Sequence, residues 1–180
     1  MTSKKYYRAI FLDRDGVVNK VIVDNEKPLS PRKFDEFELL PMVAEAIDLF
    51  KEIGYLNIII TNQPDIARGR MNSEELEKMH KLIRESLSID DILVCSHDDG
   101  DKCHCRKPKP GMLLDAASKW NIDLKKSYLI GDTWKDMEAA KSVGCKFFLI
   151  DMPYNRDIKN EHRVKDLTEA LNVINNTGIV

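Results

Sequence analysis

Short apolar runs alternate with longer amphipathic segments along most of this 180-residue chain, and that alternation constrains its fold more than any other feature. The runs have strand length, and they cover residues 7–12, 55–60, 92–95, 127–130 and 146–150. Because neighbouring parallel strands need helical crossovers, the pattern predicts an α/β fold. We expect a doubly wound, Rossmann-like parallel sheet with helices on both faces.

The segments between the runs carry helix signals. We expect Pro41 at the first position of a helix that Gly54 ends, and Asn72 or Ser73 as the cap of the next one. A third helix is predicted from Pro110 or Gly111, with Leu113, Leu114, Ala117 and Trp120 facing the core. Further helices are predicted over residues 136–143 and around 164–174. The polar stretch from 14 to 39 is expected to be a functional loop or small insertion, which amounts to a minimal cap.

Composition limits the class of protein. With 43% hydrophobic residues, the chain can build one substantial core, so residues 1–180 are predicted to form a single domain. The 28 Lys and Arg residues nearly balance the 30 Asp and Glu residues, and a net charge of −2 argues against a nucleic-acid partner. No apolar run is long enough for a bilayer or an export signal. We expect a cytoplasmic protein, monomeric and without a membrane partner.

Two carboxylates, Asp13 and Asp15, directly follow the first predicted strand, and Gly16 lets the backbone turn away sharply. At this spacing both can reach one pocket, where one attacks as a nucleophile while the other donates and accepts protons. The alternative is a solvated turn, because D-x-D-G tetrapeptides are common in loops.

Polar groups follow other predicted elements in the same way, which favours a shared site at the carboxyl ends of the strands. Thr61 can offer a hydroxyl group to a phosphate oxygen, and Lys107 a positive charge. Asp132 and Asp136 suit Mg²⁺, which prefers oxygen ligands. The candidate substrate-binding residues are Asn62, Gln63, Arg106 and Thr133.

A second cluster is predicted to hold zinc. Cys95, His97, Cys103 and Cys105 give four soft ligands from one short loop, residues 95–105, enough for a closed tetrahedral site. Closed coordination indicates structural rather than catalytic Zn²⁺. The alternatives are reduced cysteines without a metal, or His104 in place of one cysteine. The loop directly precedes Arg106 and Lys107, so bound metal would fix their position.

The order of these motifs resembles the phosphatases of the haloacid dehalogenase (HAD) superfamily. D-x-D-G, a Thr after an apolar strand, a Lys and G-D-x-x-x-D occur in that order between about residues 10 and 150. The resemblance implies a two-step phosphoryl transfer. Asp13 would form an aspartyl-phosphate, while Asp15 would protonate the leaving alcohol and then activate water. That acid role calls for a raised pKa at Asp15.

The same resemblance implies the ligands of the site. Mg²⁺ would bind the Asp13 carboxylate, the Asp15 backbone carbonyl and Asp132, with Asp136 in support. Thr61 and Lys107 would hold the phosphoryl oxygens. Positive charge from Mg²⁺ and Lys107 would let the anionic nucleophile approach a phosphate dianion.

Together with the zinc loop, the motifs are similar to the zinc-containing branch of the superfamily, whose members act on heptose bisphosphates or histidinol phosphate. Segments 11–16, 61–63, 66–69 and 105–112 look more like the heptose members. This implies hydrolysis of D-glycero-D-manno-heptose 1,7-bisphosphate to the 1-phosphate. Pro64, Asp65 and the short zinc spacer depart from that pattern, so histidinol phosphate or a different sugar phosphate stays an alternative.

A different class of function is also open: a zinc-stabilised binding protein that keeps the fold without turnover. The complete set of Asp13, Asp15, Lys107 and Asp132 favours the enzyme. Arg68 and Arg70 are interpreted as solvated, with contact to a distal phosphate as the alternative; Arg106 is the residue we expect to bind that phosphate.

Overall fold

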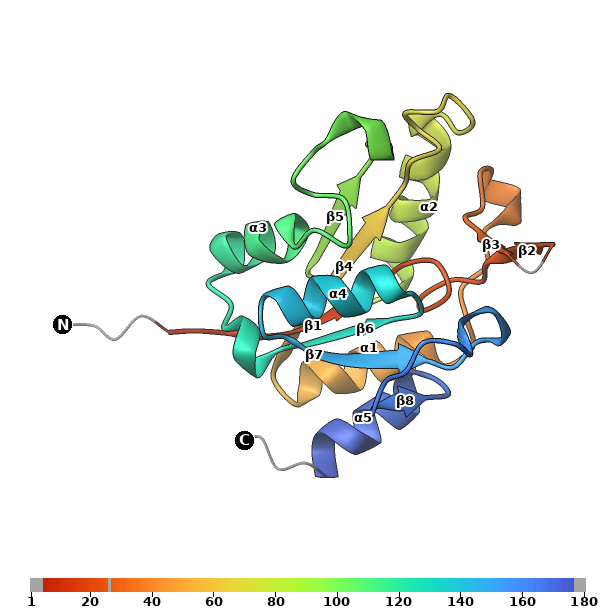
Figure 1. Cartoon of the computed structure of the whole chain (residues 1–180). Helices are drawn as coiled ribbons and strands as arrows, with labels where there is room; N and C mark the ends of the chain where they lie inside the picture. Colours follow the sequence, from red (N-terminus) through yellow and green to blue (C-terminus); the bar gives the residue numbers. More distant parts are fainter. Residues whose placement is uncertain (1–4, 26, 177–180) are drawn as a thin grey trace.

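A six-stranded parallel sheet in the order β5-β4-β1-β6-β7-β8 organises the chain (Figure 1). The structure is a computed structural model that describes residues 5–25 and 27–176. The strands of this sheet are β1 (Arg8–Leu12), β4 (Tyr55–Asn62), β5 (Asp91–Cys95), β6 (Tyr128–Gly131), β7 (Lys146–Ile150) and β8 (Arg163–Val164). The chain runs outward from central β1 through β4 and β5, then returns to the other side of β1 and continues through β6. The predicted doubly wound parallel sheet is confirmed.

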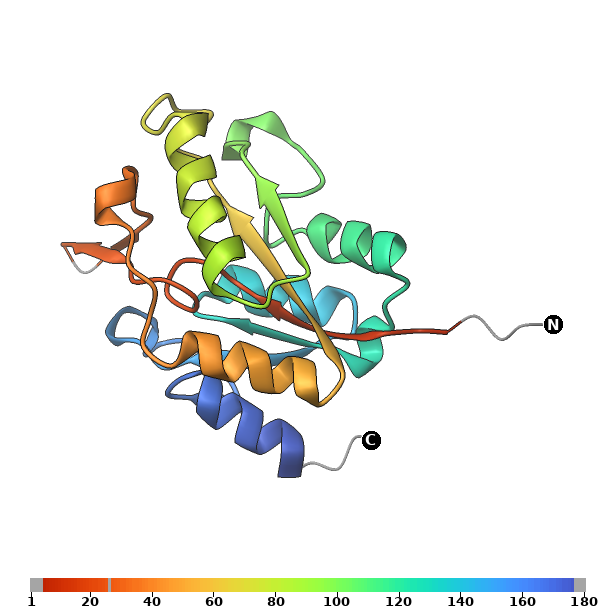
Figure 2. The ribbon, with the colours of Figure 1, turned by 180° about the vertical axis from the view of Figure 1, so that it is seen from behind.

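Helices cover both faces of the sheet, as the alternating sequence pattern predicts. One face carries α3 (Gly111–Trp120) and α4 (Trp134–Ser142), seen in front in Figure 1. The other carries α1 (Val43–Glu52), α2 (Ser73–Ser86) and α5 (Leu167–Asn176), seen in front in Figure 2. Among the described residues, no helix is both long and apolar enough to cross a membrane.

The core lies in two layers, one on each side of the sheet. Ile10 and Leu12 of β1 pack into the layer under α1, α2 and α5, whereas Ala9 and Phe11 pack under α3 and α4. All four are fully buried. Burying a Leu, Ile or Phe side chain contributes about 1.5–3 kcal/mol, so a strand buried on both sides is a strong anchor for whatever follows it.

A small cap stands above the carboxyl ends of the strands. It contains the antiparallel hairpin of β2 (Ile22–Asp24) and β3 (Lys27–Leu29), followed by a 3₁₀ turn, η1 (Phe34–Glu36). The polar stretch expected as a loop or small insertion is therefore a short hairpin. Two contacts tie it to the domain: Arg32 Nε lies 2.5 Å from Asp65 Oδ2, and Phe34 N donates to Glu75 Oε2 at 2.6 Å.

Several expected details are wrong. Pro41 does not open α1; it lies in a turn, because Met42 adopts a left-handed conformation (φ 62°) and the helix begins at Val43. Leu114 does not face the core but is half exposed, since Met112, Leu113 and Ala116 form the buried side of α3. The last helix begins at Leu167 because Val164 belongs to β8.

Helix α4 also begins earlier than predicted. Thr133 caps it, and the side chain of Asp136 reaches back to the Thr133 backbone N–H at 3.1 Å, which is the reciprocal capping box. The helix therefore starts at Trp134, two residues before the expected Asp136.

Candidate active site

A cavity of about 270 Å³ opens at the carboxyl ends of the central strands, where the chain reverses its direction across the sheet. Ligands bind at such a reversal in doubly wound sheets. Its walls come from the D-x-D-G turn, the cap hairpin and the loops after β4, β5 and β6. The lining residues are Asp13, Asp15, Val21, Pro28, Leu29, Ser30, Asn62, Pro64, Arg68, Asp99, Arg106, Lys107, Asp132, Thr133 and Lys135.

Lys107 joins two of the predicted carboxylates at the floor of the cavity. Its Nζ lies 2.9 Å from Asp13 Oδ1 and 2.6 Å from Asp136 Oδ1, and it also donates to the Ile60 carbonyl at 2.9 Å. Burial alone would lower the pKa of this lysine, but the carboxylates of Asp13 and Asp136 more than compensate and hold it above its usual range. Lys107 is therefore charged in the site.

Asp13, Asp132 and Asp136 fit a divalent cation. Each offers a carboxylate oxygen within 4.8 Å of the others, and all three are buried. Oδ1 of Asp132 is buried and has no hydrogen-bond partner in the described part of the chain. Three carboxylates against one ammonium leave a negative excess, and burial raises the pKa of Asp132 to about 7, with Asp136 adding to the rise. A cation such as Mg²⁺ would offset the excess negative charge and give the unpartnered Oδ1 of Asp132 a partner.

Asp15 has an unexpected environment. The guanidinium of the fully buried Arg14 binds both of its oxygens, Nη2 lying 2.8 and 3.1 Å away, and Ser30 Oγ donates to it at 2.7 Å. Asn19 and Gln63 donate as well. Although burial raises the pKa of Asp15, Arg14 and these donors hold it below its usual value. The raised pKa that an acid role calls for is therefore absent from this arrangement.

The predicted phosphate- and substrate-binding residues at the end of β4, Thr61, Asn62 and Gln63, divide into two groups. Asn62 lines the cavity and clamps the Lys107 backbone, donating to its carbonyl at 3.0 Å and accepting from its N–H at 3.1 Å. Gln63 is fully buried instead, and its Nε2 donates to Asp15 Oδ2 and to Thr61 Oγ1, both at 2.8 Å. Gln63 and Thr61 are not among the lining residues; Gln63 holds Asp15 rather than facing the cavity.

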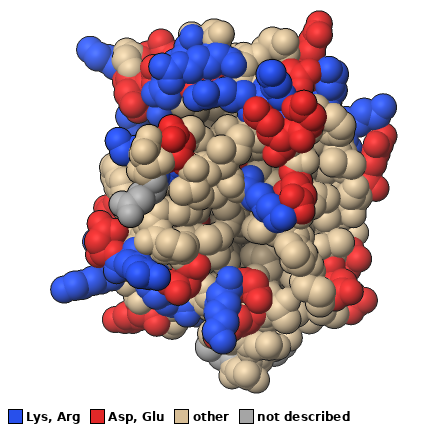
Figure 3. All heavy atoms as spheres, turned by 90° about the vertical axis from the view of Figure 1, so that its right-hand side faces the viewer, with Lys and Arg blue, Asp and Glu red and all other residues tan. Residues whose placement is uncertain are grey.

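Cations gather toward the mouth of the cavity. Arg106 Nε donates to Asp99 Oδ1 at 2.7 Å, and its Nη1 to the His97 carbonyl at 3.2 Å. Arg68 pairs with both oxygens of Asp98, at 2.6 and 2.9 Å. Arg68 is thus ion-paired at the cavity wall rather than simply solvated, whereas Arg70 is largely exposed. Figure 3 shows basic side chains along the upper border of this face, with acidic groups beside them.

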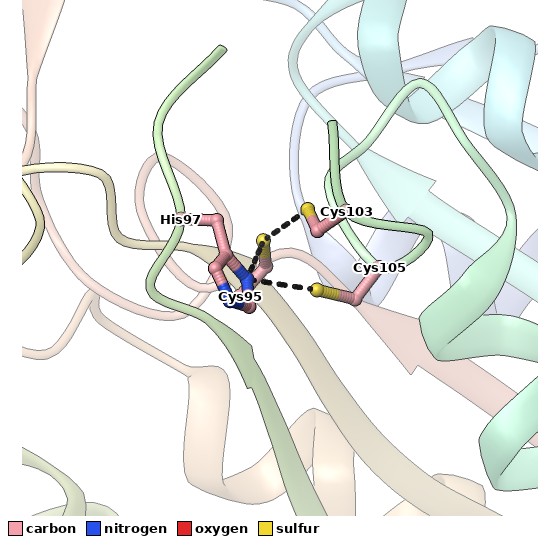
Figure 4. Close-up of side chains that lie close together, drawn as sticks. All are labelled: Cys95, His97, Cys103 and Cys105. Atoms are coloured by element: carbon pink, nitrogen blue, oxygen red, sulfur yellow. Dashed lines mark hydrogen bonds between the residues drawn. The ribbon is translucent and has the colours of Figure 1, made fainter. Parts of the chain in front are cut away.

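The four predicted zinc ligands converge (Figure 4). Sγ of Cys95 lies 3.7 Å from Sγ of Cys103 and 3.7 Å from Nδ1 of His97, while Sγ of Cys105 lies 3.4 Å from that nitrogen. A tetrahedron with Zn–S bonds of about 2.3 Å has edges of about 3.8 Å, so the spacing fits Zn²⁺. Burial raises the pKa of the Cys95 thiol to about 12, and a metal would displace that proton. His104 lies apart, against Asp115.

Sequence reasoning missed the residues that support the site from behind. Nothing in the sequence sets Arg14 apart from the carboxylates beside it. Its partner is His80, whose Nε2 lies 3.4 Å from Arg14 Nη1. The only sequence feature that marks His80 is its place on the buried side of α2. Tyr154 donates its hydroxyl to Asp132 Oδ2, and Asn155 Nδ2 donates to the Asp132 carbonyl at 2.7 Å. Both lie after β7, where the periodic pattern fades.

Comparison with known proteins agrees with this geometry. The HAD-hydrolase-like family model matches residues 104–170. A D-glycero-β-D-manno-heptose-1,7-bisphosphate 7-phosphatase of Rhodopseudomonas palustris is 37% identical over 152 residues, covering 78% of this chain and 81% of the relative. The enzyme of the same name from Helicobacter pylori is 34% identical and covers 93% of this chain and 97% of its own length. The chain belongs to the HAD phosphatase family.

A solved structure extends the likeness of this HAD phosphatase to the whole fold. The D,D-heptose 1,7-bisphosphate phosphatase of B. bronchiseptica, complexed with magnesium and phosphate, superposes with a TM-score of 0.82 at 28% sequence identity. The match covers 95% of this HAD phosphatase and 99% of the other chain. The likeness therefore extends over nearly the whole length of both chains.

Proposed function

We propose that this chain is a Mg²⁺-dependent phosphatase that converts D-glycero-D-manno-heptose 1,7-bisphosphate to the 1-phosphate. The observation that carries the proposal is the buried group of Asp13, Asp132 and Asp136 around Lys107, at the end of a cavity with cations at its mouth. The assignment of the substrate is based on the heptose-bisphosphate phosphatases that are 34–40% identical to the chain.

Asp13, Asp132 and the backbone carbonyl of Asp15 would hold Mg²⁺. Asp136 would support them, because its Oδ1 accepts from Lys107 and its Oδ2 from Thr133. Bound Mg²⁺ would neutralise part of the charge on the phosphoryl group. Lys107 neutralises more of that charge, so the anionic Asp13 can approach phosphorus.

Asp13 forms the new bond in the first step. A carboxylate oxygen of Asp13 attacks the phosphorus, the bond to the sugar oxygen breaks, and Asp15 gives that oxygen a proton. In the second step water attacks the aspartyl-phosphate, Asp15 takes the water's proton, and Asp13 is released with inorganic phosphate. A phosphate dianion beside Asp15 opposes the effect of Arg14, because a nearby negative charge raises the pKa of a carboxyl group.

The second phosphate of the substrate would meet the cations at the mouth. Arg106 is the proposed contact, and Asn62 and Thr133 are proposed to contact the sugar from the cavity wall. Asp99 and the His97 carbonyl already hold the guanidinium, which lowers the entropy lost when it binds an anion. Thr61, behind the lining, is proposed to keep its role in phosphate binding through the backbone at the end of β4.

Cys95, His97, Cys103 and Cys105 are proposed to bind a structural Zn²⁺. His97 would be both a metal ligand and, through its carbonyl, an anchor of Arg106, so zinc would stabilise the substrate side of the site. The proposal further takes residues 1–180 as one HAD-like domain, with zinc loop 95–105, that works as a cytoplasmic monomer.

A substrate panel tests the proposed function. Phosphate release would be measured with Mg²⁺ on a heptose 1,7-bisphosphate, the corresponding monophosphate, histidinol phosphate and a chromogenic phosphate ester, and ³¹P NMR would identify the phosphate lost. We expect the highest kcat/KM for the bisphosphate, with loss of the 7-phosphate. A higher kcat/KM for histidinol phosphate would overturn the proposed substrate. Binding of the bisphosphate without any hydrolysis would instead favour the non-catalytic binding protein.

A further inference from the structure

Asp132 uses its two carboxylate oxygens in different ways. The residue follows β6 directly and is 2% exposed. Oδ2 accepts a hydrogen bond from the hydroxyl group of Tyr154, whereas Oδ1 is buried and has no hydrogen-bond partner within residues 5–25 and 27–176. One oxygen of this carboxylate lies within 4.8 Å of a carboxylate oxygen of Asp13 and of Asp136. A carboxylate with one oxygen held and one free is oriented before any cation arrives.

The turn that carries Tyr154 is rigidly attached to the same strand end. Nδ2 of Asn155 donates to the Asp132 carbonyl at 2.7 Å and to the Ile150 carbonyl at 2.8 Å, so the turn bridges β6 and β7. Arg163, at the start of β8, donates to Asn155 Oδ1 at 3.1 Å and to the Asn155 carbonyl at 2.7 Å. Asn155 is 1% exposed. The turn that carries the Tyr154 hydroxyl is therefore anchored by hydrogen bonds from Asn155 to two strand ends and from Arg163 to Asn155.

Gly16 packs directly against the contact between Asp132 and Tyr154. A Cβ atom at Gly16 would lie 2.4 Å from Asp132 Oδ2 and 2.9 Å from the Tyr154 hydroxyl oxygen. The D-x-D-G turn thus packs its bare α-carbon against both groups at their point of contact. Little space is left for the Asp132 carboxylate to rotate.

We propose that Tyr154 is a positioning residue that orients Asp132 for the catalytic cation. The inference rests on the proposed function, since it takes Asp132 as a metal ligand. Without the hydroxyl group, Oδ2 would be a buried acceptor with no donor, and the carboxylate would turn to find one. Partners that orient a metal ligand typically change metal affinity or activity by about 10–100-fold when they are removed.

The test compares Tyr154→Phe with Tyr128→Phe. Tyr128 lies at the other end of β6, where its ring packs against Tyr55 and Phe148, so its variant also loses a buried hydroxyl group but away from the site. Mn²⁺ would be the probe, because its free form can be followed by electron paramagnetic resonance during titration. The Mg²⁺ concentration at half-maximal phosphatase activity and kcat at saturating Mg²⁺ would be measured in parallel.

We expect Tyr154→Phe to weaken Mn²⁺ binding and raise the half-maximal Mg²⁺ concentration by about 10–100-fold, with kcat at saturating Mg²⁺ largely restored. Tyr128→Phe should match the parent protein in Mn²⁺ affinity and in the half-maximal Mg²⁺ concentration. Equal Mn²⁺ affinity of parent and Tyr154→Phe would overturn the positioning role alone. A kcat loss that excess Mg²⁺ does not restore, with unchanged Mn²⁺ affinity, would also overturn it. Failure of the parent to bind Mn²⁺ would instead contradict the metal-dependent function itself.

Discussion

Nζ of Lys107 lies 2.9 Å from Oδ1 of Asp13, in a part of the protein that water barely reaches. The two residues come from segments far apart in the sequence, one after β1 and one after the zinc loop. The clamp from Asn62 and the bond from Nζ to the Ile60 carbonyl hold the lysine in place. The proposed nucleophile therefore has its charge partner in position before substrate binds, and this preorganisation is what makes electrostatic stabilisation effective.

Replacing Arg106 with Ala should change substrate preference. The guanidinium is the proposed contact for the second phosphate, and a charge-assisted hydrogen bond is worth roughly 1–3 kcal/mol. We expect kcat/KM to fall by about 5- to 150-fold for the heptose bisphosphate and much less for the monophosphate. Arg70→Ala, an exposed arginine outside the cavity lining, is the control. Equal losses on both substrates would contradict the assignment.

Replacing Cys103 with Ser should remove zinc and lower stability and activity together. A structural Zn²⁺ contributes directly to folding, and this one would also fix the His97 carbonyl that holds Arg106. Elemental analysis should find one Zn²⁺ per chain in the parent and none in the variant, with a lower melting temperature. Cys145 is buried outside the cluster, so Cys145→Ala should keep the metal. A zinc-free parent with full activity and stability would rule out this role.

Gly16 and Gly54 form a matched pair for substitution by Ala. Both have positive φ, 86° and 88°, so each variant should lose about 1–2 kcal/mol of stability through backbone strain. Only at Gly16 does the added methyl group meet Asp132; at Gly54 the nearest atom is 3.8 Å away. We expect kcat to fall by at least ~10²-fold for Gly16→Ala, because small displacements of catalytic groups have effects of that size. Comparable activity of the two variants would be the contrary result.

His80 should make the protein sensitive to acid. Burial lowers the pKa of His80 to about 3, and Arg14 adds to the effect, whereas the unfolded chain has the ordinary value of 6.5. Between these values the unfolded state binds more protons, so the free energy of unfolding falls as pH falls below 6.5. His80→Gln keeps an acceptor for Arg14 without the proton uptake. The parent should lose roughly 1 kcal/mol more per pH unit in this window than the variant.

Urea unfolding of both proteins at pH 7.5, 6 and 5 measures that difference. Acid effects on the zinc ligands and carboxylates are common to parent and variant and cancel in the comparison. A stability difference that stays constant over this range would show that His80 does not titrate on unfolding.

The features that could be predicted from the sequence are those that depend on residues close together along the chain. Strands such as residues 55–60 and helix caps such as Asn72 follow from periodicity and capping chemistry, and the position of each motif after a strand was enough to expect Asp13, Lys107 and Asp132 in one place. Leu114 was misplaced because adjacent helical positions differ by about 100° and two leucines compete for one face.

What could not be predicted depends on contacts between distant segments. Arg14 pairs with Asp15 only because a buried pocket beside α2 accepts its guanidinium. This pairing lowers the pKa of Asp15, although the proposed acid role led us to expect a raised pKa. Gln63 turns inward because its side-chain amide donates to Asp15 and Thr61, which lie 48 and 2 positions away along the chain. Tyr154 reaches Asp132 through a turn that is held by β8, a strand of two residues that no periodicity reveals.

The most direct test of the account is phosphate release by Asp13→Asn in the presence of Mg²⁺. An amide cannot form the acyl phosphate, and it also removes a charged ligand of the proposed cation. The account predicts a loss of at least ~10³-fold in kcat relative to the parent, with zinc content and melting temperature preserved. Near-normal Mg²⁺-dependent turnover by Asp13→Asn would contradict it.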